Sequence, residues 1–446
     1  MNEMRIEASV GLAQKVADFA HLFTLACAPS VAVENAKLAI LDCLGVSILA
    51  LTQEVGHATL SFARENADRG SCTIWGTGRT TTARDAAFCN GILSHALDYD
   101  DRNHSSTFTL AAAFAAAEDR SASGEWLLGG FIVGREVRNS LDKLFSDRNS
   151  GIGPGAKGWH SNGILGGIAA ACSAGHVLRL DRQQMRNAVG LSVGSCGALT
   201  RDGGTMAKPF RTGQAAATGL TCALLAKSGF SADEAALEGR HGLLDALAPL
   251  PDAAIQSLGK DLGVKFHLET DIKSKPFASC TATHSTTEAM LRLRSKNPIV
   301  PNSVETIECD LKPYPLVRQF PKHGVEGRFS MPFCVAMALL HGRLNADDFT
   351  DDNVNDPAIR NLMHRTKHTP GTGKLVVILR DGTQISETLS APSDLIGLNL
   401  VTEKFRRCTV SILREPQIDK VINMITKLES LPSTRELGRE IHSSIQ

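Results

Sequence analysis

Four short segments of the sequence combine titratable side chains with residues that begin or end helices. They are residues 95–101 (HALDYDD), 158–160 (GWH), 208–210 (KPF) and 275–280 (KPFASC), with His284 shortly after the last. Imidazoles, ammonium groups and carboxylates can transfer protons near neutral pH and can bind small anions. We therefore interpret the four segments as parts of one site that binds a small anion and moves a proton.

The first segment places acids beside histidines. His95 and Asp98 are three residues apart on a predicted helix, so they should share a face of it. Asp100 and Asp101 fall where that helix ends, and His104 follows three residues later. A carboxylate that orients or charges a histidine is a common acid–base arrangement. A solvated helix end is the alternative interpretation of this segment taken alone, and a divalent ion held by the acids is another.

The second segment begins a helix after a glycine-rich loop. The first turn of a helix carries unpaired N–H groups and the positive end of the dipole, so His160 could help to bind a carboxylate there. A capping or packing histidine is the alternative. The loop also contains Gly153-x-Gly155-x-x-Gly158, which formally matches the dinucleotide fingerprint. We reject that match because the preceding segment is helical and no βαβ unit follows.

The remaining two segments supply cations. Proline is favoured at the first position of a helix, so Lys208-Pro209 places Lys208 at a second helix start, with Arg211 one turn further on as a carboxylate clamp. His284 is expected at the start of a third helix. Cys280 could be a thiol nucleophile, but only Lys275 is close enough in sequence to lower its pKa.

Composition limits the class of protein. A chain of 446 residues is expected to form two domains, and a net charge of zero gives no field that favours nucleic acid or an anionic membrane. The eleven cysteines include no Cys-x-x-Cys pair, which is typical of a reducing compartment, so we expect a cytoplasmic protein. The longest apolar run, 110–117, is too short to span a bilayer. No zinc or calcium motif is found, so we expect no metal.

Apolar residues recur at spacings of three and four up to about residue 260. The expected helices are 10–26, 31–51, 55–66, 83–98, 107–118, 125–145, 161–178, 183–195, 209–228 and 234–248. The pattern then changes. We expect strands at 264–270 and 304–311, helices at 283–294 and 329–340, and a hairpin around Asp381-Gly382. Residues 401–443 return to helix. The fold class is thus mainly α: a large all-helical bundle domain (1–262, completed by 400–446) with an inserted, smaller α/β lid domain (265–395).

At these segments the chain resembles the MmgE/PrpD family, which includes 2-methylcitrate dehydratase, cis-aconitate decarboxylase and iminodisuccinate epimerase. The resemblance also covers residues 85–91 (DAAFCNG) and 327–332 (GRFSMP), and it extends over essentially the whole length. It implies a helical domain formed by both chain ends, an inserted lid, a homodimer and no organic cofactor. The active-site residues that it implies are Asp98, His104, His160, Lys208 and His284.

The sequence departs from the family pattern near its motifs. Arg102 stands where a threonine is common, Ser105 replaces a proline, and Arg211 replaces a frequent histidine. Gly155 occupies the position of the epimerase tyrosine, which counts against epimerisation. Candidate substrate-binding residues are Arg102, Arg211, Lys275 and Ser279.

The leading hypothesis is a cofactor-independent lyase that dehydrates or decarboxylates a small di- or tricarboxylic acid, with the second domain as a lid. An epimerase of a dicarboxylate such as iminodisuccinate is the first alternative. A non-catalytic anion-binding protein on the same fold is the second.

Overall fold

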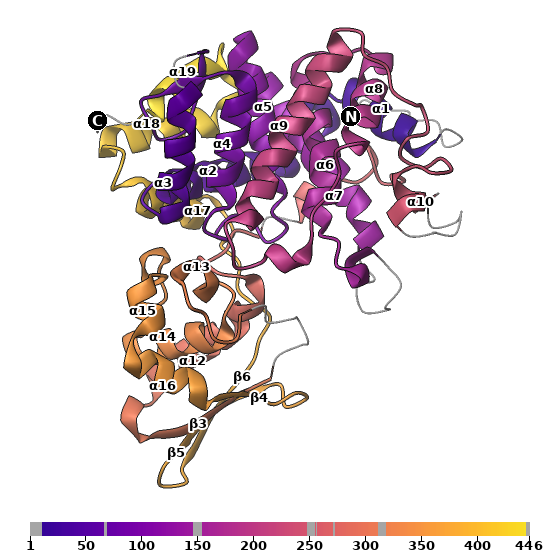
Figure 1. Ribbon diagram of the computed structural model, residues 1–446. Coiled ribbons are helices and arrows are strands. Elements are labelled where there is room, and N and C mark those ends of the chain that lie inside the picture. The colour runs from indigo at the N-terminus through magenta and orange to yellow at the C-terminus, as the bar shows by residue number, and fades with distance from the viewer. Residues whose placement is uncertain are drawn as a thin grey trace.

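The computed structural model describes residues 11–66, 69–145, 154–247, 255, 257–270, 273–310 and 318–442. Gly153 of the rejected fingerprint lies outside the described residues, as do the two chain ends, 1–10 and 443–446. The described part is mainly helical with a small α/β region, so the predicted fold class is confirmed (Figure 1).

The larger body in Figure 1 is made of helices from both ends of the chain. Its helices are α1 (Leu12–Leu22), α2 (Ser30–Ala50), α3 (Glu54–Ala63), α4 (Ala83–His95), α5 (Ser105–Arg120), α6 (Gly124–Leu141), α7 (Ser161–Val177), α8 (Arg182–Val193), α9 (Ala207–Lys227), α10 (Leu243–Leu247), α17 (Leu398–Thr409), α18 (Glu415–Thr426) and α19 (Thr434–Glu440). A two-stranded sheet pairs β1 (Cys72–Thr73) with β2 (Thr80–Thr81). The C-terminal helices α17 and α18 pack on α2, and α19 packs on α5.

Small residues allow the helices near the site to pack closely. Helices α4 and α9 meet at Gly91 and Gly213, and a Cβ atom on Gly91 would lie 2.8 Å from the Cα of Gly213. No real Cβ contact is that short, so both helices need glycine at this crossing. Helix α5, with a run of buried alanines, lies against both of them. The close packing fixes the two helices that carry His95 and Lys208.

The smaller body, orange in Figure 1, packs helices against a mixed sheet. Its elements are α12 (His284–Lys296), β3 (Val304–Cys309), α13 (Gly324–Gly327), α14 (Met331–His341), α15 (Asp351–Asn355), α16 (Pro357–Arg365), β4 (Thr366–His368), β5 (Lys374–Leu379) and β6 (Gln384–Thr388). The strand order is β4-β3-β5-β6, with β3 parallel to β4 and the other pairs antiparallel. The expected hairpin is present, and Gly382 adopts the left-handed φ of 85° that its turn requires. We call this body the lid.

Two segments connect the lid to the helical body. Ser274 pairs with Leu395 in an isolated antiparallel bridge, so the outgoing and returning segments lie side by side. The amide of Arg102 also donates to the carbonyl of Lys273 at 3.1 Å. The entry to the lid is therefore tied directly to the loop that follows α4.

Two of the expected elements are wrong. Residues 264–270 form no strand; a short 3-10 turn, His267–Glu269, takes its place. The amides of His267 and Leu268 donate to the buried carboxylate of Glu136 on α6, which satisfies them without a partner strand. Within 234–248 the described residues are helical only at Leu243–Leu247.

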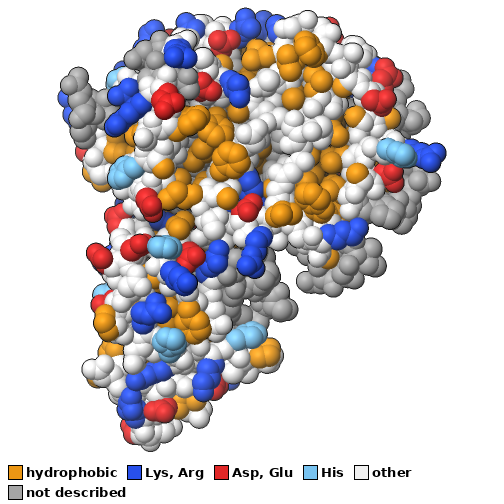
Figure 2. All heavy atoms as spheres, viewed as in Figure 1, with side chains coloured by type: hydrophobic (Ala, Val, Ile, Leu, Met, Phe, Trp, Pro, Cys, Tyr) orange, Lys and Arg blue, Asp and Glu red, His pale blue; other side chains and the backbone are white. Residues whose placement is uncertain are grey.

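The two bodies differ in surface character on the face shown in Figure 2. Hydrophobic side chains gather in several clusters over the helical body, whereas charged side chains are dense over the lid. No single helix in the described ranges has the length and hydropathy to cross a membrane; the bent pair of α2 and α3 passes that test only by length and composition.

Candidate active site

The loop between α4 and α5 carries the acids of the first motif in a strained conformation. Helix α4 ends at His95, so Asp98 lies beyond it and does not share a helical face with His95 as expected. Asp98 and His104 both adopt left-handed backbone conformations, with φ of 49° and 58°. Non-glycine residues rarely adopt this conformation unless their surroundings hold them in it, and such residues cluster at functional sites.

Asp98 is the centre of a buried ion cluster. Its Oδ1 atom lies 2.5 Å from Nζ of Lys275 and 3.4 Å from Nε2 of His104, and its Oδ2 atom lies 3.2 Å from Nζ of Lys208. Both lysines are less than 7% exposed. Lys208 also lies over the ring of Phe329, 5.1 Å from its centroid. One carboxylate therefore balances two buried ammonium groups, one from the helical body and one from the segment that enters the lid.

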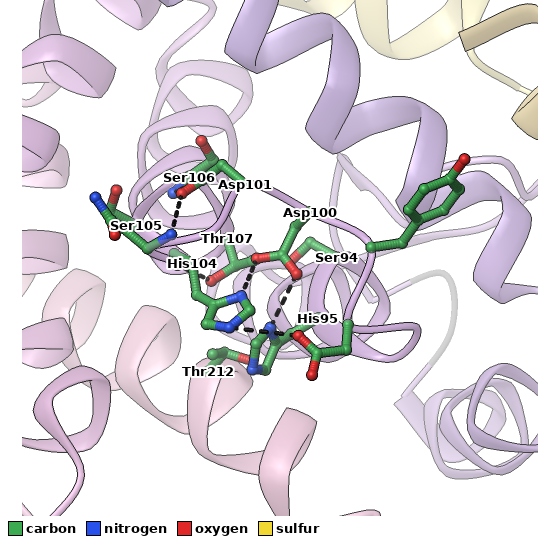
Figure 3. Close-up of polar contacts among 12 residues, drawn as sticks. Ser94, His95, Asp100, Asp101, His104, Ser105, Ser106, Thr107 and Thr212 are labelled. Carbon is green, nitrogen blue, oxygen red and sulfur yellow. Dashed lines mark hydrogen bonds and ion pairs between the residues drawn. The ribbon is translucent and has the colours of Figure 1, made fainter. Parts of the chain in front are cut away.

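Asp100 fixes the orientation of two histidines (Figure 3). Its Oδ2 atom lies 2.8 Å from Nδ1 of His104, and its Oδ1 atom lies 3.2 Å from Nδ1 of His95. With Nδ1 of His104 bonded to Asp100, the Nε2 atom is turned toward Asp98. This aspartate–histidine contact is the acid–base arrangement that the sequence predicts, but Asp100 takes the orienting role assigned to Asp98.

The third acid of the motif is structural. The Asp101 carboxylate accepts hydrogen bonds from the amides of Asn103 and Ser106 and lies 3.3 Å from Nη1 of Arg135. These contacts hold the first turn of α5, as Figure 3 shows for Ser106. Arg135 is fully buried on α6, so it balances the charge of Asp101 and does not reach the cavity described next.

A cavity of about 680 Å³ adjoins the Asp98 cluster, and both bodies contribute to its wall. The side from the helical body includes Asp98, Arg102, Asn103, His104, Arg138, Asp142, His160, Ser161, Asn162 and Lys208. The side from the lid and its connecting segments includes residues 280–282, Ser285, Asp310, Phe329, Gly373 and residues 389–392. This volume is in the range that holds a small organic ligand.

Charge and burial set the protonation states around the cavity. Burial alone would raise the pKa of Asp98, but Lys208 and Lys275 hold it well below its usual value. Burial lowers the pKa of Lys208, and the charge of Lys275 lowers it further against the opposing charge of Asp98. Burial raises the pKa of Cys280, so its thiol is a poor nucleophile. Asp98 is thus ionised at neutral pH, and Lys208 loses its proton more easily than an ordinary lysine.

The environment of the two cavity histidines, His104 and His160, favours their neutral form. Burial lowers the pKa of His104, and the charges of Lys208 and Lys275 lower it further, although Asp100 opposes them. Burial, followed by the charges of Arg211 and Lys208, lowers the pKa of His160 well below its usual value. A neutral imidazole can accept a proton or a hydrogen bond from a ligand.

His160 lies where the sequence places it, at the start of α7. It is the N-cap residue, and its Nδ1 atom accepts a hydrogen bond from the amide of Asn162 at 3.3 Å. The capping role therefore accompanies its place in the cavity wall. Nη2 of Arg138 donates a hydrogen bond to Oδ1 of Asn162 in the same turn, at 3.0 Å. It also forms an ion pair with Oδ1 of Asp142, at 3.1 Å.

Arg138 is a cavity residue that the sequence analysis missed. It is 3% exposed and belongs to α6, in the polar C-terminal half of that helix. Two arginines, Arg135 and Arg138, within one predicted helix were a usable signal, because arginine is rarely buried without a partner. Together with Arg102 and Lys208, Arg138 gives the cavity wall three cations.

The structure does not bring every predicted residue to the cavity wall. Lys275 contacts the cavity only through Asp98, and its own pKa is raised because Asp98 and Asp100 outweigh the effect of burial. His284 is fully buried behind the wall, with Nε2 3.1 Å from the carbonyl of Ser279, and burial lowers its pKa to about 3. The cavity wall formed by the described residues therefore does not include His284.

Two predicted substrate-binding residues are also engaged elsewhere. The Ser279 hydroxyl is buried against that of Thr283 at 2.9 Å. Nη1 of Arg211 donates to the carbonyl of Leu199 at 2.6 Å, and the described cavity wall does not include Arg211. Arg102 does line the cavity, although its Nε atom lies 2.6 Å from Oδ1 of Asp394 in the returning segment.

The described residues contain one cluster of metal-ligating atoms, formed by His95, Asp100 and His104. Each of these groups already has a hydrogen-bond partner inside the cluster, because Asp100 bonds one imidazole with each of its oxygens. Hydrogen bonds between Asp100 and the two imidazoles therefore explain why these side chains cluster, without a metal ion.

Two family models together match most of the chain. The MmgE/PrpD N-terminal domain matches residues 14–256, and the MmgE/PrpD C-terminal domain matches residues 277–430. The chain belongs to the MmgE/PrpD family.

Curated relatives cover almost the whole chain. The cis-aconitate decarboxylase of Mus musculus is 27% identical over 91% of this chain and 88% of its own length. That of Aspergillus terreus is 24% identical over 90% of both chains. The mitochondrial 2-methylcitrate dehydratase of Yarrowia lipolytica is 23% identical over 92% of this chain and 86% of its own length. All are lyases, and the chain is a lyase of this family type.

Proposed function

We propose that the protein is a lyase that removes carbon dioxide or water from a small di- or tricarboxylic acid of the cis-aconitate or 2-methylcitrate type. The observation that carries the proposal is the buried Lys208–Asp98–Lys275 cluster at the wall of a cavity also lined by two histidines. Loss of carbon dioxide leaves a carbanion-like centre on the substrate. Loss of water requires such a centre to form next to a carboxylate. Such chemistry needs cations for the carboxylates and a nearby group that moves one proton.

The cations of the wall match a multiply charged acid. Arg102, Arg138 and Lys208 come from three separate elements, so they can hold more than one carboxylate of the same ligand. The acids Asp98, Asp142 and Asp310 also line the cavity and limit its net positive charge. We infer that the ligand is held by directed contacts and not by a general positive field.

Lys208 is the best candidate for the group that moves the proton. Its lowered pKa brings it closer to neutral pH, and Asp98, which also lines the cavity, lies 3.2 Å from its Nζ atom. In a decarboxylation the ammonium group would protonate the carbon that has lost carbon dioxide. In a dehydration, the neutral His104 or His160 would accept the proton from carbon, and Lys208 would protonate the departing hydroxyl group. The dehydration takes one proton from carbon and gives one to the hydroxyl group, so it needs no net proton. The decarboxylation consumes one proton, and solvent must return it to Lys208.

A substrate screen tests the proposal directly. We expect purified protein to convert at least one acid among cis-aconitate, citrate and 2-methylcitrate, with products identified by mass spectrometry. Loss of the mass of carbon dioxide identifies a decarboxylase, and loss of the mass of water identifies a dehydratase. The higher identity to the decarboxylases supports testing cis-aconitate first. An isomeric product with inverted stereochemistry, which gains the mass of one deuterium in place of hydrogen when formed in deuterated water, would contradict the lyase and identify an epimerase.

Activity should survive removal of metal ions. The three ligating side chains His95, Asp100 and His104 already satisfy one another, so a chelator should leave kcat unchanged. The measurement compares turnover before and after dialysis against EDTA, with total metal determined by plasma mass spectrometry. Loss of activity that one metal ion restores would assign this cluster a metal and contradict the proposed mechanism.

A further inference from the structure

Consecutive backbone carbonyls at the centre of the site accept hydrogen bonds from different buried cations. The pairs are Leu97 O with Nη1 of Arg328 at 3.2 Å, Asp98 O with Nζ of Lys275 at 2.8 Å, and Tyr99 O with Nζ of Lys404 at 2.7 Å. All three cations are at most 3% exposed. We call this arrangement the carbonyl clamp. It surrounds the residue whose left-handed backbone presents its carboxylate to Lys208 and His104.

Lys404 belongs to neither the cavity wall nor any of the four sequence motifs. It lies on α17, near the C-terminus, and its Nζ atom contacts Oδ1 of Asp42 on α2 at 2.7 Å. The same atom donates to Oγ of Ser274 at 3.1 Å and lies 3.9 Å from the centroid of the Tyr99 ring. A buried lysine with this many directed partners holds them in a fixed relation.

The partners of Lys404 flank both members of the Asp98–Lys275 ion pair. Tyr99 directly follows Asp98 in the chain, and Ser274 directly precedes Lys275. Lys404 therefore bonds the residue next to Asp98 in the helical body and the residue next to Lys275 in the segment that enters the lid. Arg328 contributes from the lid by bonding Leu97 O and also Ala278 O at 2.8 Å.

We propose that Lys404 is a positioning residue of the active site: it holds Asp98 in its strained conformation at the correct distance from Lys208 and Lys275. The inference rests on the proposed function for its effect on turnover. A displacement of an aligned catalytic group by about one ångström can lower a rate by about a hundredfold. The side chains of Arg102 and Arg138, which would bind substrate carboxylates, pair with Asp394 and Asp142 and not with the partners of Lys404, so its loss should affect kcat much more than KM.

The test replaces Lys404 with methionine, which keeps the length of the side chain and removes its charge and hydrogen bonds. We expect kcat to fall by about tenfold or more, with KM nearly unchanged. Lys404→Arg should restore part of the activity, because a guanidinium group can also bond a carboxylate and a carbonyl. If Lys404→Met alone fails to fold, Asp42→Asn combined with Lys404→Met removes the unpaired buried charge and is assayed in its place.

Lys37→Met is the matched control. Lys37 is 4% exposed on the same helix as Asp42, and its Nζ atom contacts Glu34, Glu429 and the carbonyl of Thr426, all remote from the cavity. Its partners Glu34 and Glu429 are exposed, so its loss should cost less stability than that of Lys404, and it should leave kcat unchanged. If the wild type is active and a folded Lys404→Met variant has the same kcat as Lys37→Met, the inference is overturned.

A second measurement does not require turnover. Cys280 lines the cavity, and it follows Ser279, whose carbonyl lies 3.4 Å from Nζ of Lys275. Loosening of the clamp should speed the alkylation of Cys280 by N-ethylmaleimide, measured by peptide mass spectrometry, while Cys27 and Cys196 serve as internal references. If the wild type converts none of the acids, the proposed function fails and this measurement alone decides the inference. An unchanged Cys280 rate in the folded Lys404→Met variant would then overturn it.

Discussion

Replacement of Lys208 by methionine is expected to lower kcat by about a hundredfold or more on the substrate that the screen identifies. Methionine preserves the packing against Phe329 but removes the ammonium group that would deliver the proton. The change also leaves Asp98 with Lys275 as its remaining lysine partner, so the cluster keeps a balanced charge. Steady-state kinetics across the pH range of the wild-type enzyme provide the measurement.

Lys227→Met is the control for this substitution. Lys227 ends the same helix, α9, and its Nζ atom donates to the carbonyl of Leu178, remote from the cavity. Both variants should melt close to the wild type, and only Lys208→Met should lose activity. If Lys208→Met retains wild-type turnover, Lys208 has no role in the chemical step and the mechanism fails.

Replacement of His104 by asparagine should produce a loss of similar size, about a hundredfold in kcat. Asparagine tolerates the left-handed conformation that His104 adopts at φ 58°, so the backbone can keep its path. The substitution removes the imidazole that Asp100 orients toward Asp98 and the cavity. We expect the loss in kcat with little change in secondary structure by circular dichroism.

His241→Asn makes the same change at a matched backbone. His241 also has a left-handed φ, 65°, but it is exposed and does not line the cavity. Its replacement should leave kcat unchanged. Equal losses in the two variants would mean that the effect comes from the backbone and not from the imidazole, which would contradict a catalytic role for His104.

Local sequence signals predicted individual elements well. The turn at Asp381-Gly382 and the helix start at His160 each depend on a few adjacent residues, and each lies where the sequence places it. The strand expected at 264–270 failed because a distant carboxylate, Glu136, satisfies the backbone there. Periodicity contains no information about such a partner.

The candidate site was predictable in the parts that adjacent residues determine. The motifs indicated Asp98, His104 and Lys208 as functional, but not that Lys275 would pair with Asp98 across 177 positions. A buried partner of this kind depends on how the lid meets the helical body. The same long-range packing buries His284 outside the described cavity wall and places Arg138 in that wall.

The pairing of Asp42 with Lys404 has a consequence for the order in which the chain folds during synthesis. Helix α2 emerges early from the ribosome, but the helix that covers it, α17, is made only after the entire lid. The lid has all of its strands and helices before α17 exists, so it can fold while the helical body still lacks a wall. Until then Asp42 and the apolar face of α2 stay uncovered. The nascent protein is therefore exposed to aggregation until α17 has been made, and the loop between α4 and α5 can take its final shape only after that.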